Sequence, residues 1–150
     1  MHFRGVDHIG FTVSDLDRSV RFYTMLLGHE PDIRLAWTDT EDAFVSRIIG
    51  YEGAQLEAAY WQISGGPVLE LLAYHRPPTG RVDMETYNVG SGHVGLLTDD
   101  IHAEFVRLRD HVEFRNVEPV EIPSGPAQGG FAIYFRDPDG ITIELVQPPP

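Results

Sequence analysis

The chain contains an internal repeat, and this repeat limits the possible folds more than any other feature. The run HIGFTVSDL at 8–16 matches HVGLLTDDI at 93–101 in its His, Gly and Asp positions, at an offset of 85 residues (93 − 8). The apolar runs VLELL at 68–72 and TIELV at 142–146 each enclose a glutamate, at an offset of 74 residues (144 − 70). The sequence therefore predicts two copies of one module, with 11 more residues in the first copy (85 − 74).

Both copies follow the same predicted order of elements. Residues 5–13 are rich in β-branched and aromatic side chains, which favours a strand. The run SDLD at 14–17 resembles a capping box led by Ser14, and an apolar stripe at helical spacing then continues to Gly28. Asp99 or Asp100 begins the corresponding helix of the second copy. The predicted strands that follow are 33–37, 43–49, 55–63 and 67–74 in the first copy and 114–121, 130–136 and 141–147 in the second.

Apart from one additional predicted strand in the longer first copy, this order is βαβββ twice, and it predicts an α+β fold in one domain over residues 1–150. We expect module 1 at about 4–75, a linker at about 76–90 with its prolines and glycines, and module 2 at about 91–147. The run DPDG at 137–140 predicts a hairpin turn between the last two strands.

The composition excludes several kinds of chemistry. The chain has no cysteine, and all of its 11 basic residues are arginine, so thiol catalysis, Cys-ligated zinc and lysine Schiff bases are impossible. A formal charge of −12 argues against nucleic-acid binding. We expect a cytoplasmic protein without membrane contact, because the sequence has neither a long apolar run nor a signal-peptide pattern.

Two histidines and two glutamates occupy matching places in the two copies: His8 and Glu70, then His93 and Glu144. Taken singly, each glutamate could point to solvent and each histidine could be an ordinary core or surface group. Their recurrence favours a shared site instead, because a carboxylate within an apolar strand needs a partner. Two imidazoles and two carboxylates suit a divalent cation, whose charge the carboxylates cancel. We therefore predict that these four residues come together around a metal.

The runs that carry these positions resemble the vicinal oxygen chelate superfamily, the group of glyoxalases, bleomycin-resistance proteins and extradiol dioxygenases. The DPDG turn before the final glutamate strand is the most specific of these motifs. The resemblance implies two tandem βαβββ modules that form a U-shaped mixed sheet around a central cleft, as in glyoxalases. The matching runs are DHIG at 7–10, DLDRSVRFY at 15–23, LG at 27–28, LEL at 69–71, GHVG at 92–95 and FRDPDGITIEL at 135–145.

The set His-Glu-His-Glu is similar to that of bacterial glyoxalase I, whereas methylmalonyl-CoA epimerase carries Gln at the place of Glu70. The resemblance implies a lyase or isomerase that uses one divalent ion (Ni, Co, Mn, Zn or Fe) held by His8, Glu70, His93 and Glu144. It would stabilise the enediolate of a small substrate with adjacent oxygens, with Glu144 first and Glu70 second as the candidate base. The alternatives are an Fe(II) extradiol-type dioxygenase and a non-catalytic small-molecule-binding or resistance protein. A homodimer is expected, and the site could lie within one chain or be shared between two.

Two departures from glyoxalase I concern the substrate. Bacterial glyoxalase I has Arg four residues after the first His and Asn four residues after the first Glu, for glutathione; this chain has Thr12 and Tyr74 there. These departures weigh against a glutathione hemithioacetal as the substrate, the acidic surface disfavours a CoA thioester, and the substrate stays unassigned. The aromatic candidates for a substrate pocket are Phe11, Trp61, Tyr74 and Tyr134, although such side chains also fill cores.

Overall fold

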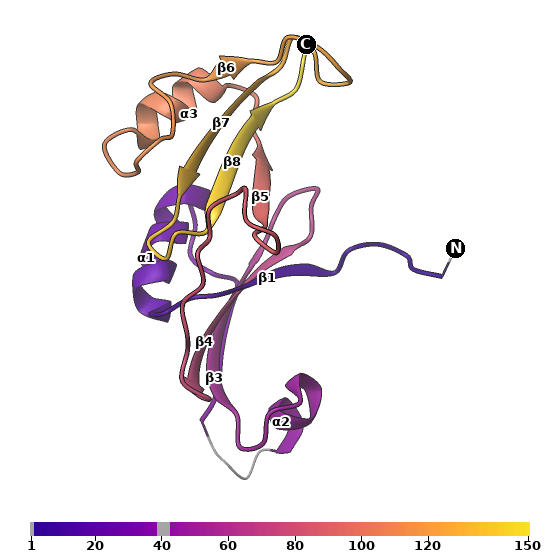
Figure 1. The fold of residues 1–150 in the computed structure, drawn as a ribbon, viewed down its shortest axis with the longest axis vertical. Helices are drawn as coiled ribbons and strands as arrows, with labels where there is room; N and C mark the ends of the chain where they lie inside the picture. Colours follow the sequence, from indigo (N-terminus) through magenta and orange to yellow (C-terminus); the bar gives the residue numbers. More distant parts are fainter. Residues whose placement is uncertain (1, 39–42) are drawn as a thin grey trace. The chain divides into compact units, whose positions relative to one another are not determined.

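The structure, a computed structural model, describes residues 2–38 and 43–150. It divides the chain into two compact units, Met1–Arg81 and Val82–Pro150. Each unit contains one four-stranded sheet with helices, so the predicted α+β class is confirmed (Figure 1). No helix within the described ranges is both long enough and apolar enough to cross a membrane.

The two sheets have the same topology. In the first unit the strand order is β1-β4-β3-β2, with β1 parallel to β4 and the other pairs antiparallel. In the second unit the order is β5-β8-β7-β6, with β5 parallel to β8 and the other pairs antiparallel. The elements are β1 (His8–Thr12), α1 (Leu16–Leu27), β2 (Ile33–Trp37), α2 (Ala43–Ile49), β3 (Gln55–Gln62), β4 (Val68–Arg76), β5 (His93–Leu97), α3 (Ile101–Leu108), β6 (Val120–Glu121), β7 (Phe131–Arg136) and β8 (Thr142–Gln147).

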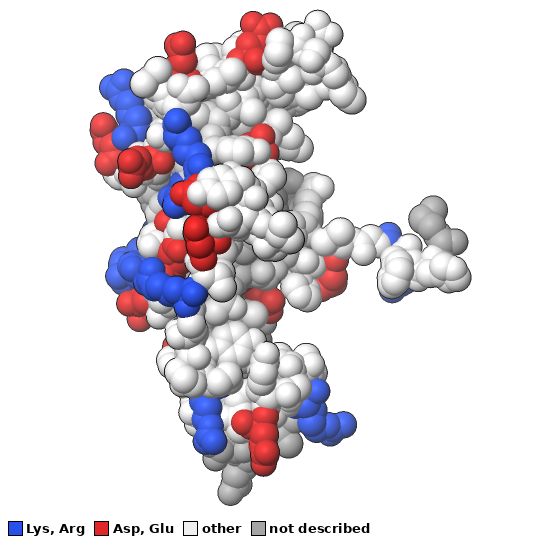
Figure 2. Space-filling model, in the orientation of Figure 1, with Lys and Arg blue, Asp and Glu red and all other residues white. Residues whose placement is uncertain are grey.

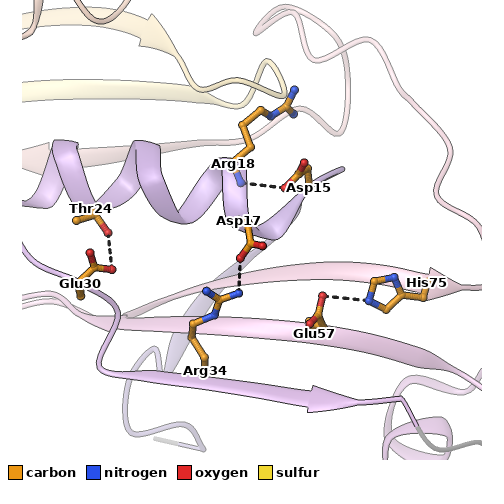
Figure 3. Close-up of polar contacts among 8 residues, drawn as sticks. All are labelled: Asp15, Asp17, Arg18, Thr24, Glu30, Arg34, Glu57 and His75. Carbon is orange, nitrogen blue, oxygen red and sulfur yellow. Dashed lines mark hydrogen bonds and ion pairs between the residues drawn. The ribbon is translucent and has the colours of Figure 1, made fainter.

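Charged side chains are scattered over the surface shown in Figure 2. On the face drawn in Figure 2, the arginines lie interspersed with aspartates and glutamates, so the excess negative charge is not concentrated in one patch there. Close-range pairing contributes to this pattern within the first unit, where Arg34 on β2 binds Asp17 on α1 at 2.7 Å (Figure 3).

Helix α1 begins one residue later than the capping box predicts. The side chain of Asp15 accepts a hydrogen bond from the backbone N–H of Arg18 at 2.9 Å, which makes Asp15 the N-cap (Figure 3). Ser14 instead accepts a hydrogen bond from the Arg18 guanidinium. The predicted end of the helix is correct: Gly28 has a left-handed backbone (φ 80°), which glycine adopts without steric cost.

Helix α1 covers one face of the first sheet. Its buried residues include Val20 and Tyr23, and the ring of Tyr23 lies 5.9 Å from that of Trp61 on β3. Trp61 is completely buried, and its indole N–H donates to the carbonyl oxygen of His29 at 3.2 Å. The core of the first unit therefore lies between α1 and this face of the sheet.

The second unit contains a cluster of three phenylalanines and the predicted hairpin. Phe114 contacts both Phe105 of α3 and Phe135 of β7, with ring centroids 4.8 and 5.3 Å away. In the DPDG turn, the buried side chain of Asp137 accepts hydrogen bonds from the backbone N–H groups of Asp139 and Ile141 at 2.9 and 2.8 Å. These bonds close the hairpin between β7 and β8 as predicted.

Two predicted strands are wrong. Residues 43–49 form helix α2, in which Val45 and Ile49, one helical turn apart, pack against Leu56 of the sheet. Of the predicted strand 114–121, only β6 and an isolated bridge at Phe114 pair with β7. Pro119 has no N–H to donate to a strand partner, and the side chain of Asn116 accepts from the next backbone N–H, so a local turn replaces the strand.

Candidate metal centre

The first half-site lies on β1 and β4 of the first unit. Gly10 pairs with Glu70 across the parallel strands, and His8 lies two residues before Gly10 on the same face of the sheet. His8 Nε2 is 3.6 Å from Glu70 Oε2, while His8 Nδ1 is 2.9 Å from a carboxylate oxygen of Asp7. Because a carboxylate only accepts, Nδ1 carries the proton and Nε2 is directed to Glu70. The hydrogen bond with Asp7 is the main reason that the pKa of His8 is raised.

The second half-site lies on β5 and β8 and repeats this arrangement. Gly95 pairs with Glu144 across the parallel strands, and His93 Nε2 is 3.3 Å from Glu144 Oε2. The two carboxylates are mostly enclosed, with 14% of the Glu70 side chain and 20% of the Glu144 side chain exposed, whereas about half of each imidazole is open to solvent (50% for His8 and 43% for His93). Each pair can therefore be reached from outside its own unit.

The antiparallel neighbour strand adds a tyrosine to each half-site. Tyr60 on β3 pairs with Glu70, and Tyr134 on β7 pairs with Glu144, so each tyrosine shares a face with its glutamate. Burial and then a hydrogen bond with Glu70 raise the pKa of Tyr60 to about 12. Burial, the charge of Glu144 and a hydrogen bond with it raise the pKa of Tyr134.

Sequence reasoning named Tyr134 but not Tyr60. The repeat holds the signal that identifies it, because the two tyrosines are 74 residues apart (134 − 60), the same offset that relates Glu70 and Glu144. An alignment of the two copies on these glutamates therefore places the tyrosines at one common position.

The other predicted aromatic contacts divide between the two faces of the first sheet. Tyr74 lies on the same face as Glu70, four residues further along β4, and burial and the charge of Glu70 raise its pKa. Phe11 pairs with Leu71 and so lies on the opposite face. Trp61 also lies on that opposite face, where it is fully enclosed beneath α1. The alternation of side chains along β3 directs Trp61 into the core, which corrects the prediction that it contacts the substrate.

Helix α2 partly covers the face that carries Glu70. It belongs to the longer first copy, and the second unit has no helix between β6 and β7 in the described chain. The apolar cluster beneath α2 includes Leu72 and Tyr74, which follow Glu70 on the same face of β4 (Figure 1 shows α2 beside the ends of β3 and β4). The Glu70 half-site therefore has an apolar wall on one side.

The described residues contain no cluster of three or more potential metal ligands, so the four predicted ligands occur as two pairs, one in each unit. Each pair by itself fits a divalent ion. Two donors bound at about 2.1 Å to one ion, at roughly 90° to 110° from each other, lie about 3.0 to 3.4 Å apart. The observed N···O separations of 3.6 and 3.3 Å are close to this range, and an imidazole nitrogen with a carboxylate oxygen suits Ni, Co, Mn, Zn or Fe.

Comparison with known families shows which family this chain belongs to. The model of the Glyoxalase/Bleomycin resistance protein/Dioxygenase superfamily matches residues 5–145. The chain belongs to this superfamily. Members with similar sequences include a 2-epi-5-epi-valiolone epimerase from Actinomyces sp, which is 32% identical over 151 residues that cover 96% of this chain and 79% of the relative. A lactoylglutathione lyase from Salmonella typhimurium is 32% identical over 146 residues, covering 93% of this chain and 90% of the relative.

Solved structures of superfamily members share the fold. A glyoxalase family protein from Bacillus cereus has a TM-score of 0.80 at 21% identity and covers 100% of this chain and 97% of its own. The trypanothione-dependent glyoxalase I from Leishmania major has a TM-score of 0.62 at 24% identity, covering 97% of this chain and 87% of its own. At these identities the likeness concerns the fold, while the related sequences support an enzyme of lyase or epimerase type.

Proposed function

We propose that the protein is a divalent-metal-dependent lyase or isomerase, of glyoxalase or epimerase type, acting on a small substrate with adjacent oxygens. The observation that carries this proposal is the matched pair of half-sites, in which His8 and Glu70 repeat as His93 and Glu144 at N···O separations of 3.6 and 3.3 Å. Each half-site supplies one nitrogen and one oxygen donor, and the two carboxylates neutralise the charge of one divalent ion. When bound, the cation supplies Lewis-acid stabilisation of negative charge on the substrate oxygens.

In this proposal the carboxylates of Glu70 and Glu144 also move the proton. A carboxylate beside a carbon-bound hydrogen removes the proton from a carbon next to a carbonyl, and the electron pair of that bond moves onto the carbonyl oxygen. Return of the proton to the opposite face of the same carbon is an epimerisation, and return to the neighbouring carbon is an isomerisation. Glu144 is our first candidate for the base and Glu70 the second, and their titrations would be coupled through the shared cation.

Among the two reactions that the relatives' names suggest, we favour epimerisation of an uncharged hydroxyketone over chemistry on glutathione. Thr12 and Tyr74 lie on the same face as Glu70, at the positions where bacterial glyoxalase I carries its glutathione-binding Arg and Asn. A hydroxyl and a phenol replace a cation and an amide there, beside the apolar cluster under α2. The formal charge of −12 further favours a substrate of low negative charge over a CoA thioester.

Proton exchange with solvent tests this function. The protein is freed of metal with a chelator, reloaded with Ni²⁺ or Co²⁺, and incubated in D₂O with 2-epi-5-epi-valiolone or, separately, with a glutathione hemithioacetal. We expect metal-dependent deuterium incorporation at a carbon beside the carbonyl of the ketone, lost in Glu144→Gln. Incorporation only into the hemithioacetal would overturn the preference for the ketone. Consumption of oxygen with a catechol by protein reloaded with Fe²⁺, without deuterium exchange in either substrate, would identify a ring-cleaving dioxygenase instead.

A further inference from the structure

We propose that Tyr60 and Tyr134 are positioning residues of the two half-sites: each phenol donates a hydrogen bond to the glutamate opposite it and so sets which carboxylate oxygen faces a divalent cation. This role rests on the proposed function, because it assigns the tyrosines to the carboxylates that we propose as metal ligands. It adds to each half-site a third residue, which comes from a different strand.

The backbone register is the first argument. Tyr60 pairs with Glu70 across β3 and β4, and Tyr134 pairs with Glu144 across β7 and β8. Side chains that are directly opposite on antiparallel strands lie about 5 Å apart at Cβ, so a phenol reaches the neighbouring carboxylate without any displacement of the strands. The same cross-strand pair in both units indicates a shared role more strongly than one pair would.

The chemistry of the paired groups is the second argument. The glutamate opposite each phenol contributes to raising the pKa of that phenol, Glu70 that of Tyr60 and Glu144 that of Tyr134. A phenol is protonated at neutral pH and is therefore the donor to an ionised carboxylate. A carboxylate that accepts such a bond on one oxygen has lost the free rotation of that group, and its second oxygen remains for a cation.

The Tyr134 hydroxyl has a further neighbour that shows which contact can persist when a metal binds. It lies 3.4 Å from His93 Nε2, and the rings are 5.3 Å apart. The Nε2 atom of a neutral imidazole has one lone pair, so it cannot bind a cation and accept from the phenol at once. With Nε2 occupied by a cation, the carboxylate of Glu144 is the acceptor that remains for Tyr134.

The test compares Tyr60→Phe and Tyr134→Phe with Tyr87→Phe, a control at a side chain that is 80% exposed. Co²⁺ alone is titrated into each metal-free protein by calorimetry, and the visible spectrum of the bound Co²⁺ is recorded. Loss of a group that orients a metal ligand typically lowers metal affinity about 10- to 100-fold. For Tyr60→Phe and Tyr134→Phe we expect a decrease in Co²⁺ affinity of that size and an altered Co²⁺ spectrum, whereas Tyr87→Phe should match the unaltered protein. In Tyr60→Phe and Tyr134→Phe, kcat should change more than KM.

A second measurement needs no metal. In the metal-free protein, double-mutant cycles by urea unfolding pair Tyr60→Phe with Glu70→Gln and, as a matched control, Tyr60→Phe with Glu144→Gln. We expect coupling only within the first pair. Unchanged Co²⁺ affinity in both Tyr→Phe variants, with the unaltered protein binding Co²⁺, overturns the positioning role and leaves the proposed metal site standing. A failure of the unaltered protein to bind Co²⁺ overturns the metal site, and the positioning role with it.

Discussion

Gly10 lies directly beside the carboxylate of Glu70: a Cβ atom at Gly10 would be 2.7 Å from Glu70 Oε2. The equivalent position in the second unit is less crowded, because a Cβ at Gly95 would be 3.7 Å from Glu144 Oε2, an ordinary van der Waals distance. The glycine of the first repeat therefore leaves room for the carboxylate that we propose as a ligand, and this asymmetry provides a matched pair of substitutions.

Gly10→Ala is expected to displace the carboxylate of Glu70 and to lower Co²⁺ affinity about tenfold or more. The free energy of unfolding should change by no more than about 1 kcal/mol, because the flexible end of Glu70 can move away and the new alanine stiffens the unfolded chain. Gly95→Ala is the control and should leave Co²⁺ affinity unchanged. Calorimetric titration with Co²⁺ and urea unfolding measure the two quantities, and equal losses of affinity in both variants would contradict the prediction.

Asp15→Ala is expected to destabilise the first unit by about 1 kcal/mol, because it removes the side-chain acceptor for the backbone N–H of Arg18 at the start of α1. Asp15→Asn keeps an acceptor and should retain most of the stability. Ser14→Ala removes only the hydroxyl that accepts from the Arg18 guanidinium, so its effect should stay within about 0.5 kcal/mol. Urea unfolding of the three variants distinguishes the two candidate caps, and a larger loss in Ser14→Ala than in Asp15→Ala would reverse the assignment.

Glu85 is expected to make stability depend on pH. Its carboxylate binds Arg115 at 3.0 Å and Arg136 at 2.6 Å, and the hydrogen bond from Arg115, followed by that from Arg136, lowers its pKa. Because the pKa is lower in the folded than in the unfolded protein, the stabilisation is complete above the ordinary glutamate pKa and is lost as the pH falls through the lowered value.

Urea unfolding over a series of pH values tests this effect with Glu85→Gln. The variant should be less stable than the unaltered protein at pH 7, and the difference should shrink steadily as the solution is acidified below the ordinary glutamate pKa. Glu118→Gln, at an exposed glutamate of the same unit, serves as the control. A difference between Glu85→Gln and the unaltered protein that stays constant across the acid range would show that the carboxylate charge does not contribute.

Trp61→Phe is expected to cost about 1–3 kcal/mol of stability, because it leaves a space against Tyr23 and removes the N–H donor to the His29 carbonyl. Its KM for any substrate should be unchanged, since Trp61 lies on the α1 face of the sheet. Urea unfolding and initial-rate kinetics measure the two effects. A KM changed tenfold with full stability would return Trp61 to the substrate site.

Much of the fold could be predicted because patterns among residues close together in the sequence specify it. The helical spacing of Leu16, Val20 and Tyr23 marks the buried side of α1, and the DPDG turn is closed by hydrogen bonds of Asp137 to residues two and four positions further on. Segment 43–49 was mispredicted because its β-branched residues also suit a strand. Its helical state depends on packing of Val45 and Ile49 against Leu56, which composition does not record.

The candidate site divides in the same way. The two offsets of the repeat single out His8, Glu70, His93 and Glu144 from the chain itself, because matched modules place equivalent residues at equivalent points of their sheets. The neighbours of these residues depend on strand register. The pairing of β3 with β4 puts Tyr60 beside Glu70 and turns Trp61 into the core, and a shift of one residue would exchange the two side chains. Register arises from contacts between strands, so only the folded sheet could assign the tyrosine to the carboxylate and the tryptophan to the core.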